Sequence, residues 1–228
     1  MNQDDSQRSG RLAAQNAPIA PAAPVTVLPA YPGIASDHVM LVRTAADAQR
    51  AYEAMRSADF LGFDTESKPI FFKGQASDGP HLIQLATDNM AYLFPVAHLA
   101  AADAADIIAV LKALLESPTI VKLGFGLSDD NRRLRAKFKI EPFAVLDLSR
   151  VMRESKYREM GAKAAVAKYL GMTLQKSKKI STSNWASTHL SERQIQYAAD
   201  DAQVALLVYR VWLNRDPPQN SLLRTQSA

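Results

Sequence analysis

The feature that most constrains the fold is a change in the spacing of apolar residues along the chain. Residues 60–66, 81–86 and 91–94 are short runs typical of strands, and the turn residues between them predict a three-stranded meander. Apolar residues recur at helical spacing over 101–116, and strand-like and helical segments then alternate. This order predicts an α/β fold with a mixed β-sheet flanked by α-helices.

The other expected elements lie on both sides of the meander. Strands are expected over 38–42, 119–123 and 143–148, and a helix that Thr44 and Asp47 cap follows the first of them. Further helices are expected over 128–138, 149–154, 162–170 and 191–213. Ser128 is expected to cap the helix it begins, and Ser191 with Gln194 forms a capping-box pattern.

The length of 228 residues and the hydrophobic content of 47% suit a single domain with its own core. We place this domain at residues 37–214. Residues 1–36 form an arm rich in proline and alanine that is expected to be disordered, because it offers little that a core could bury. Residues 215–228 are expected to be a flexible tail.

Composition excludes several classes of protein. The chain has no cysteine, so disulfide scaffolds, thiolate zinc sites and cysteine nucleophiles are excluded, and any metal must be held by oxygen or imidazole. The net charge of +4 is compatible with a polyanionic partner. No apolar stretch reaches the roughly 18 to 20 residues that span a bilayer, and the N-terminus does not resemble a signal peptide. We therefore expect a cytoplasmic protein without a membrane partner.

Two carboxylates stand at the end of the first long strand. Asp64 and Glu66 are two residues apart, so on a strand their side chains face the same way. Like charges at this separation raise each other's pKa unless a cation lies between them, and a hard divalent cation is the usual solution. Taken alone, the pair fits solvated carboxylates at a strand end better than a metal site.

A phenol and a carboxylate lie one turn apart on the last expected helix. Tyr197 and Asp201 share one helical face, next to the small residues Ala198, Ala202 and Ala205, which allow close approach. The two side chains could place a hydroxyl and a metal ligand around one water molecule. In isolation they could also be a half-buried tyrosine and an exposed aspartate.

The third pattern is a glycine turn between a strand and a helix. Lys122-Leu-Gly124-Phe-Gly126 leads to Asp129 and Asp130 at the start of the helix. A dinucleotide-binding turn is one interpretation, but Asp129 takes the place of its third glycine, and two carboxylates would repel a pyrophosphate. In a metal site the glycines would admit a bulky ligand while Asp130 points into the cleft. An aspartate that only complements the helix dipole remains the alternative.

Together the three patterns resemble the DEDD exonucleases of the tyrosine subclass, in their order and their spacing. The resemblance is to ribonuclease D and to Werner-syndrome-type exonuclease domains, and it covers about residues 40–213. The residues that carry it are Asp64-Thr-Glu66, the turn from Lys122 to Asp130 with Leu134, Gln196-Tyr197-Ala-Ala-Asp-Asp201, Leu170-Gly171 and Ser183-Asn184-Trp185. The distances to Leu134 and Tyr197 select Asp130 and Asp201 over their neighbours, and Gln196 stands where the other subclass has histidine.

The resemblance implies a ribonuclease H-like fold and a metal-dependent 3′–5′ exonuclease acting on a free 3′ end of DNA or RNA. It implies two divalent cations, Mg²⁺ or Mn²⁺, with Asp64, Glu66, Asp130 and Asp201 as metal ligands. Tyr197 would orient the attacking water, and the product would be a nucleoside 5′-monophosphate. A catalytically silent nucleic-acid-binding module of the same fold is the second hypothesis, although all five site residues are retained.

Substrate contacts are expected from basic and aromatic residues beside these motifs. Thr65, Lys178, Asn184 and Trp185 are the candidates, in a basic segment that also holds Lys176 and Lys179. Such residues bind a strand through its phosphates and by stacking on its bases. A solvated basic loop in which Trp185 is packed as an anchor is equally compatible with the sequence.

Overall fold

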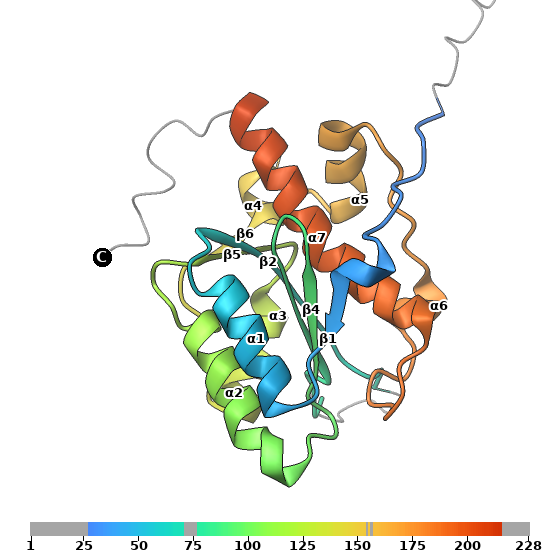
Figure 1. Cartoon of the computed structure of the whole chain (residues 1–228). Helices are drawn as coiled ribbons and strands as arrows, with labels where there is room; N and C mark the ends of the chain where they lie inside the picture. The colour runs from blue at the N-terminus through green and yellow to red at the C-terminus, as the bar shows by residue number, and fades with distance from the viewer. Residues whose placement is uncertain (1–26, 71–76, 154, 156, 216–228) are drawn as a thin grey trace, which may run out of the picture.

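The computed structural model describes residues 27–70, 77–153, 155 and 157–215. In this part of the chain six strands form one sheet in the order β1-β4-β3-β2-β5-β6 (Figure 1). The strands are β1 (Val39–Leu41), β2 (Phe60–Glu66), β3 (Leu82–Ala86), β4 (Ala91–Pro95), β5 (Val121–Gly124) and β6 (Val145–Asp147).

The pairing confirms a mixed sheet around a central meander. Strands β2, β3 and β4 are antiparallel neighbours, whereas β1 with β4, β2 with β5 and β5 with β6 are parallel. Among the six strands of the described ranges, β3 alone therefore runs against the others, and the carboxyl ends of β2, β5 and β6 meet at one edge. In open α/β sheets this edge is where ligands bind.

Helices cover both faces of the sheet. Their bounds are η1 (Ser36–His38), α1 (Ala45–Met55), α2 (Ala101–Leu115), α3 (Ser128–Phe138), α4 (Leu148–Val151), α5 (Ala162–Ala165), the π-helical turn η2 (Val166–Leu170), α6 (Lys178–Ser181) and α7 (Glu192–Arg215). The expected capping boxes are present at α1, with Thr44 and Asp47, and at α7, with Ser191 and Gln194. None of the helices in the described ranges is long and apolar enough to cross a bilayer.

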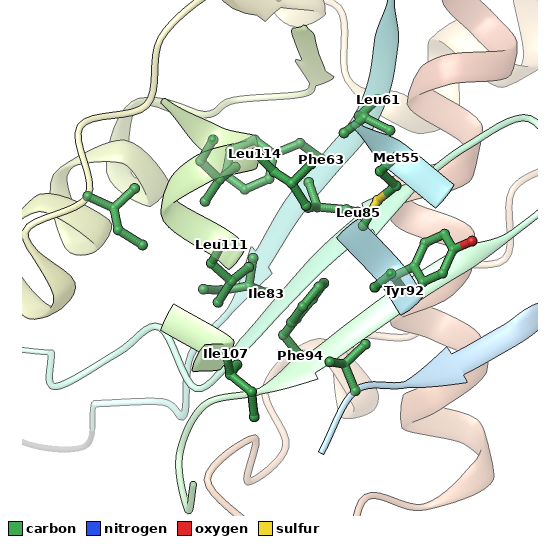
Figure 2. Packing of buried hydrophobic residues seen from close by; sticks show 14 of the residues in the cluster. Met55, Leu61, Phe63, Ile83, Leu85, Tyr92, Phe94, Ile107, Leu111 and Leu114 are labelled. Atoms are coloured by element: carbon green, nitrogen blue, oxygen red, sulfur yellow. The ribbon is translucent and has the colours of Figure 1, made fainter. Parts of the chain in front are cut away.

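Alternation along β2 separates its two faces. Leu61 and Phe63 point into the core that α1 and α2 cover, which Figure 2 shows with Ile83, Phe94 and Leu111 around them. The alternate positions face α7, which crosses the other side of the sheet (Figure 1). Because the side chains of a strand alternate, Asp64 and Glu66 lie on the α7 face, as the two-residue spacing predicts.

The arm expected to be disordered was predicted to extend to residue 36, but its last part is packed against α7. The Tyr31 hydroxyl donates to Gln203 Oε1 at 2.6 Å, the Ile34 amide donates to Asp200 Oδ1 at 2.9 Å, and Ile34 is buried. These apolar and polar contacts hold the segment in place although its sequence is rich in proline. Residues 1–26 and 216–228, which include most of the expected tail, lie outside the described residues.

Two local expectations also need correction. Helix α4 ends at Val151, three residues before the predicted end. Ser128 does not cap α3: its hydroxyl accepts from Arg150, while Asp147 at the end of β6 accepts from the amides of Gly126 and Leu127, at 2.9 and 3.2 Å. Asp147 thus fixes the turn that leads into α3, and the helix itself begins without a side-chain cap.

Candidate active site

Three carboxylates from two elements form a cluster at the carboxyl end of β2. Asp64 and Glu66 come from β2 and Asp201 from α7, and one ligand oxygen of each lies within 4.8 Å of the others. Two oxygens that share an ion at about 2.0–2.6 Å are at most about 5 Å apart, so this spacing suits one hard cation. The residues predicted from strand alternation and from helical spacing are therefore brought together in space.

The environment of the cluster opposes its own negative charge. Burial, followed by the charges of Asp130 and Asp201, raises the pKa of Asp64 well above its usual range. Burial, together with Asp64 and Asp201, raises the pKa of Glu66 to about 9. Burial also raises the pKa of Asp201. The site therefore stores electrostatic repulsion that positive charge would relieve.

One positive charge already meets the cluster. Lys176 Nζ lies 2.9 Å from Asp201 Oδ2, and it lies 5.7 Å from the centroid of the Tyr197 ring. Burial alone would lower the pKa of Lys176, but the nearby charges of Asp201, Asp64 and Glu66 outweigh it and raise the pKa. In the sequence Lys176 belongs to a basic segment that is expected to bind phosphate, and nothing in that pattern predicts this ion pair.

Tyr197 lies beside the carboxylates, one turn before Asp201 on the same face of α7. Burial, and then the charges of Asp201, Glu66 and Asp64, raise the pKa of Tyr197. Its ring packs against Trp185, with 6.1 Å between ring centroids. The phenol therefore keeps its proton and is held in one orientation.

Trp185 supports the site from within the core. It is 1% exposed, and its indole N–H donates to the Ser181 carbonyl at 3.1 Å. Of the two interpretations of this residue, the packed anchor therefore holds, and the expectation that Trp185 stacks on a base is wrong for this arrangement. An aromatic residue flanked by serines and lysines gives the same sequence pattern in both cases.

Asp130 reaches the cluster from the other side of β2. It is buried and accepts a hydrogen bond from the Thr65 hydroxyl, while its charge raises the pKa of Asp64. It is not among the three residues whose oxygens share the 4.8 Å spacing. Asp129, by contrast, is exposed and pairs with Arg132 at 2.9 Å, so the structure turns Asp130 inward and Asp129 outward.

The glycine turn has a different purpose from the one expected. A β-carbon on Gly124 would lie 2.3 Å from the Phe63 carbonyl oxygen, so this glycine lets the end of β5 approach β2 rather than admitting a ligand. The amides of Gly126 and Leu127 are already bonded to Asp147. A pyrophosphate would find these donors occupied, which further weakens the dinucleotide-binding interpretation.

Two further candidate residues lie at the surface, and one buried polar residue lies next to Asp64. Lys178 and Asn184 are exposed, and Asn184 Oδ1 accepts from the Ala186 amide at 3.1 Å. Gln84 is fully buried on β3, where it pairs with Asp64 of the neighbouring strand β2. Its side-chain amide has no hydrogen-bond partner among the described residues. The sequence shows Gln84 as one polar residue in an otherwise apolar strand, and this pattern alone does not indicate that it lies beside the site.

Known proteins are similar to this chain in both sequence and fold. The chain is 31% identical over 158 residues to the bifunctional 3′–5′ exonuclease/ATP-dependent helicase WRN of Mus musculus, and 28% identical over 155 residues to a 3′–5′ exonuclease of Arabidopsis thaliana. These matches cover 68% and 67% of the chain but 11% and 52% of the two relatives. The chain therefore spans only part of their length.

Solved structures agree with this similarity. The Nibbler EXO domain of Aedes aegypti superposes with a TM-score of 0.67 at 26% identity, covering 79% of this chain and 89% of that one. Escherichia coli RNase D superposes with a TM-score of 0.64 at 23% identity, covering 77% and 44%, and confirms the ribonuclease H-like fold. A family model described as 3′–5′ exonuclease matches residues 39–213, a range that includes all six strands of the sheet and the three carboxylates of the cluster. The chain belongs to this 3′–5′ exonuclease family.

Proposed function

We propose that this protein is a metal-dependent exonuclease that removes nucleotides from the 3′ end of DNA or RNA and releases nucleoside 5′-monophosphates. The observation that carries the proposal is the convergence of Asp64, Glu66 and Asp201 within 4.8 Å at the sheet edge where ligands bind. Membership in the exonuclease family supports the same activity.

The donor set fits hard divalent cations. All candidate ligands are carboxylate oxygens, and their mutual repulsion is what bound positive charge would relieve. We propose that Asp64, Glu66 and Asp201 hold one Mg²⁺ or Mn²⁺ ion, and that Asp64 with Asp130 holds a second. When bound, such ions lower the pKa of a water molecule and stabilise the charge on the leaving 3′-oxygen.

The protein's own groups would orient the reactants. Tyr197 keeps its proton at neutral pH, and its raised pKa moves it still further from ionisation, so it acts as a hydrogen-bonding group rather than a base. It would align the attacking water, with Trp185 fixing its ring. Thr65 would contribute indirectly, since its hydroxyl holds Asp130 in the inward orientation.

The strand itself would be held by exposed groups near the site. Lys178 and Asn184 remain candidates for contacts with phosphate and base, because both are exposed and lie on or beside α6. Trp185 does not contribute to this surface. Whether DNA or RNA is preferred would depend on contacts with the 2′-hydroxyl.

The test is to incubate the protein with DNA and RNA oligonucleotides labelled at either end, in Mg²⁺, Mn²⁺ or chelator. We expect stepwise shortening of 5′-labelled strands only with metal, and nucleoside 5′-monophosphates as products. Binding without shortening under all conditions would support a silent binding module instead and would overturn the proposal.

Two neighbouring aspartates provide a matched pair of variants. Loss of a residue that only hydrogen-bonds to a metal ligand lowers activity by roughly 10- to 100-fold. As a proposed metal ligand, Asp130 should matter more, so Asp130→Asn should lower the rate by more than this. Asp129→Asn removes the same charge from an exposed position and should leave the rate nearly unchanged. Equal effects of the two substitutions would contradict the assignment of Asp130.

A further inference from the structure

Lys176 forms an ion pair with a proposed metal ligand whose side chain is almost completely buried. Its ammonium lies 2.9 Å from Asp201 Oδ2, and the Asp201 side chain is 4% exposed. Charge interactions are much stronger in such surroundings than between solvated groups on the surface. The contact is therefore more than an incidental surface pair.

The ammonium and a metal ion would occupy the same electrostatic environment. Asp201 shares its 4.8 Å cluster with Asp64 and Glu66, and the charge of Lys176 acts on all three carboxylates. A cation bound by these oxygens would lie about 2.0–2.6 Å from each. Two positive charges this close to one carboxylate repel each other, so the ion pair and full metal occupancy oppose one another.

We propose that Lys176 is an internal counter-cation, which pairs with Asp201 while the site lacks metal and leaves this carboxylate when a divalent cation binds. The inference rests on the proposed metal site and deepens it, because it assigns to one side chain the control of metal affinity. Lys176 is a positioning residue in this role: it keeps the carboxylates together before the metal arrives.

The surroundings allow the side chain to move while the backbone stays in place. The segment is anchored just before Lys176, where Leu174 is buried and the Thr173 amide donates to the Pro29 carbonyl at 2.7 Å. The Lys176 side chain itself is 29% exposed, so it has access to solvent. The Tyr197 ring, whose centroid is 5.7 Å from the ammonium, is a neighbour that does not depend on the charge of Asp201.

Three roles for Lys176 predict different changes in metal affinity. If Lys176 is a counter-cation, removing its charge tightens metal binding and destabilises the metal-free protein. If it only supports the local fold, its loss weakens metal binding together with stability. If it contacts substrate phosphate alone, metal binding stays the same.

The experiment measures Mn²⁺ binding by titration calorimetry and thermal unfolding in chelator, with the full chain. Lys176→Met keeps the length of the side chain and removes its charge. Lys176→Arg retains the charge, and Lys179→Met removes a charge from an exposed position in the same segment. We expect Lys176→Met to bind Mn²⁺ at least about fivefold more tightly, the lower end of usual coupling between two ligands, and to unfold at a lower temperature in chelator.

The two control variants should behave like the wild-type protein in both measurements. Unchanged or weaker Mn²⁺ binding by Lys176→Met overturns the inference, whether or not the protein shortens oligonucleotides. Failure of the proposed function is a separate result, in which Mn²⁺ binds but no strand is shortened.

A measurement on the wild-type protein keeps the inference testable if Lys176→Met does not fold. Lysines are acetylated with a water-soluble reagent, and the modification of each is followed by mass spectrometry with chelator or with Mn²⁺. Release from Asp201 should make Lys176 react faster when Mn²⁺ is present, while Lys179 reacts equally in both. A rate at Lys176 that stays constant or falls with Mn²⁺ contradicts the exchange.

Discussion

Gly62 sets the distance between the two halves of the carboxylate cluster, and replacing it with alanine should damage both stability and activity. It lies on β2, two residues before Asp64, and faces α7 at Ala202, the residue after Asp201. A β-carbon at this position would lie 2.0 Å from the Ala202 carbonyl oxygen and 2.8 Å from its carbon. Both atoms belong to the helix backbone, so no side chain can rotate away to make room.

The size of the effect follows from this overlap. Relieving a 2.0 Å contact to an ordinary one near 3.4 Å requires α7 and β2 to separate by about 1.4 Å if the strain is not shared. Overpacking a well-packed core costs about 1–3 kcal/mol. A misplacement of about 1 Å can lower a catalytic rate by about 100-fold. We therefore expect Gly62→Ala to lower the melting temperature by about 2–12 °C.

The assay compares Gly62→Ala with Gly161→Ala in thermal unfolding, Mn²⁺ binding and oligonucleotide shortening. Gly161 has a φ of −76°, and no atom of the described residues lies within 4 Å of an added β-carbon, so alanine fits there without strain. Its variant should change stability by less than about 1 kcal/mol, because loss of a glycine at a helix cap and the lower entropy of the unfolded chain offset each other. Equal stability, metal binding and rate for the two variants would refute the reasoning.

Three further predictions concern other parts of the site and its supports. The raised pKa of Glu66 contributes stability to the metal-free protein that is fully present below pH 4.5 and is lost as pH rises through about 9. Urea unfolding in chelator should therefore show a free energy of unfolding that falls between these pH values, and Glu66→Gln should reduce this fall. A free energy of unfolding that rises with pH over the same range would contradict the prediction. Gln84→Met should raise the free energy of unfolding by about 1–3 kcal/mol, because it replaces two buried polar atoms that have no hydrogen-bond partner among the described residues with apolar ones. If denaturant titration shows a lower free energy of unfolding than for the wild-type protein, the amide has a partner. Ile34→Ala should cost about 2–5 kcal/mol and increase hydrogen exchange in α7 near Asp200, whereas an exposed site would show neither effect.

The fold and the cluster could be predicted where local periodicity determines the outcome. A period of two places Asp64 and Glu66 on one face of β2, and a helical period places Tyr197 beside Asp201. Turn residues between the apolar runs similarly indicated the meander of β2 to β4. In each case the deciding interaction spans only a few residues, so the sequence pattern contains it.

Other features depend on contacts between distant segments, which local patterns do not contain. Tyr31 meets Gln203 across 172 residues of sequence, and Lys176 meets Asp201 through a segment without regular structure. Lys122 lies within the strand expected over 119–123, and that pattern says nothing of where its charge goes. Its ammonium in fact donates to the carbonyls of Ser117 and Ile120, at 2.8 and 2.7 Å, and burial lowers its pKa to about 8.

The rotation of α7 about its axis explains why the paired aspartates are not interchangeable. Tyr197 and Asp201 face the carboxylates of β2, whereas Gln196 and Asp200, one position earlier in each pair, bind the backbone of Ile34. Successive helical residues are about 100° apart, so one turn of the helix presents two faces with separate partners. Rotating α7 to bring Asp200 into the cluster would break the contacts with Ile34 and bury the wrong carboxylate. The packed N-terminal segment therefore helps to select which aspartate reaches the site, although it lies before the region that the exonuclease family shares.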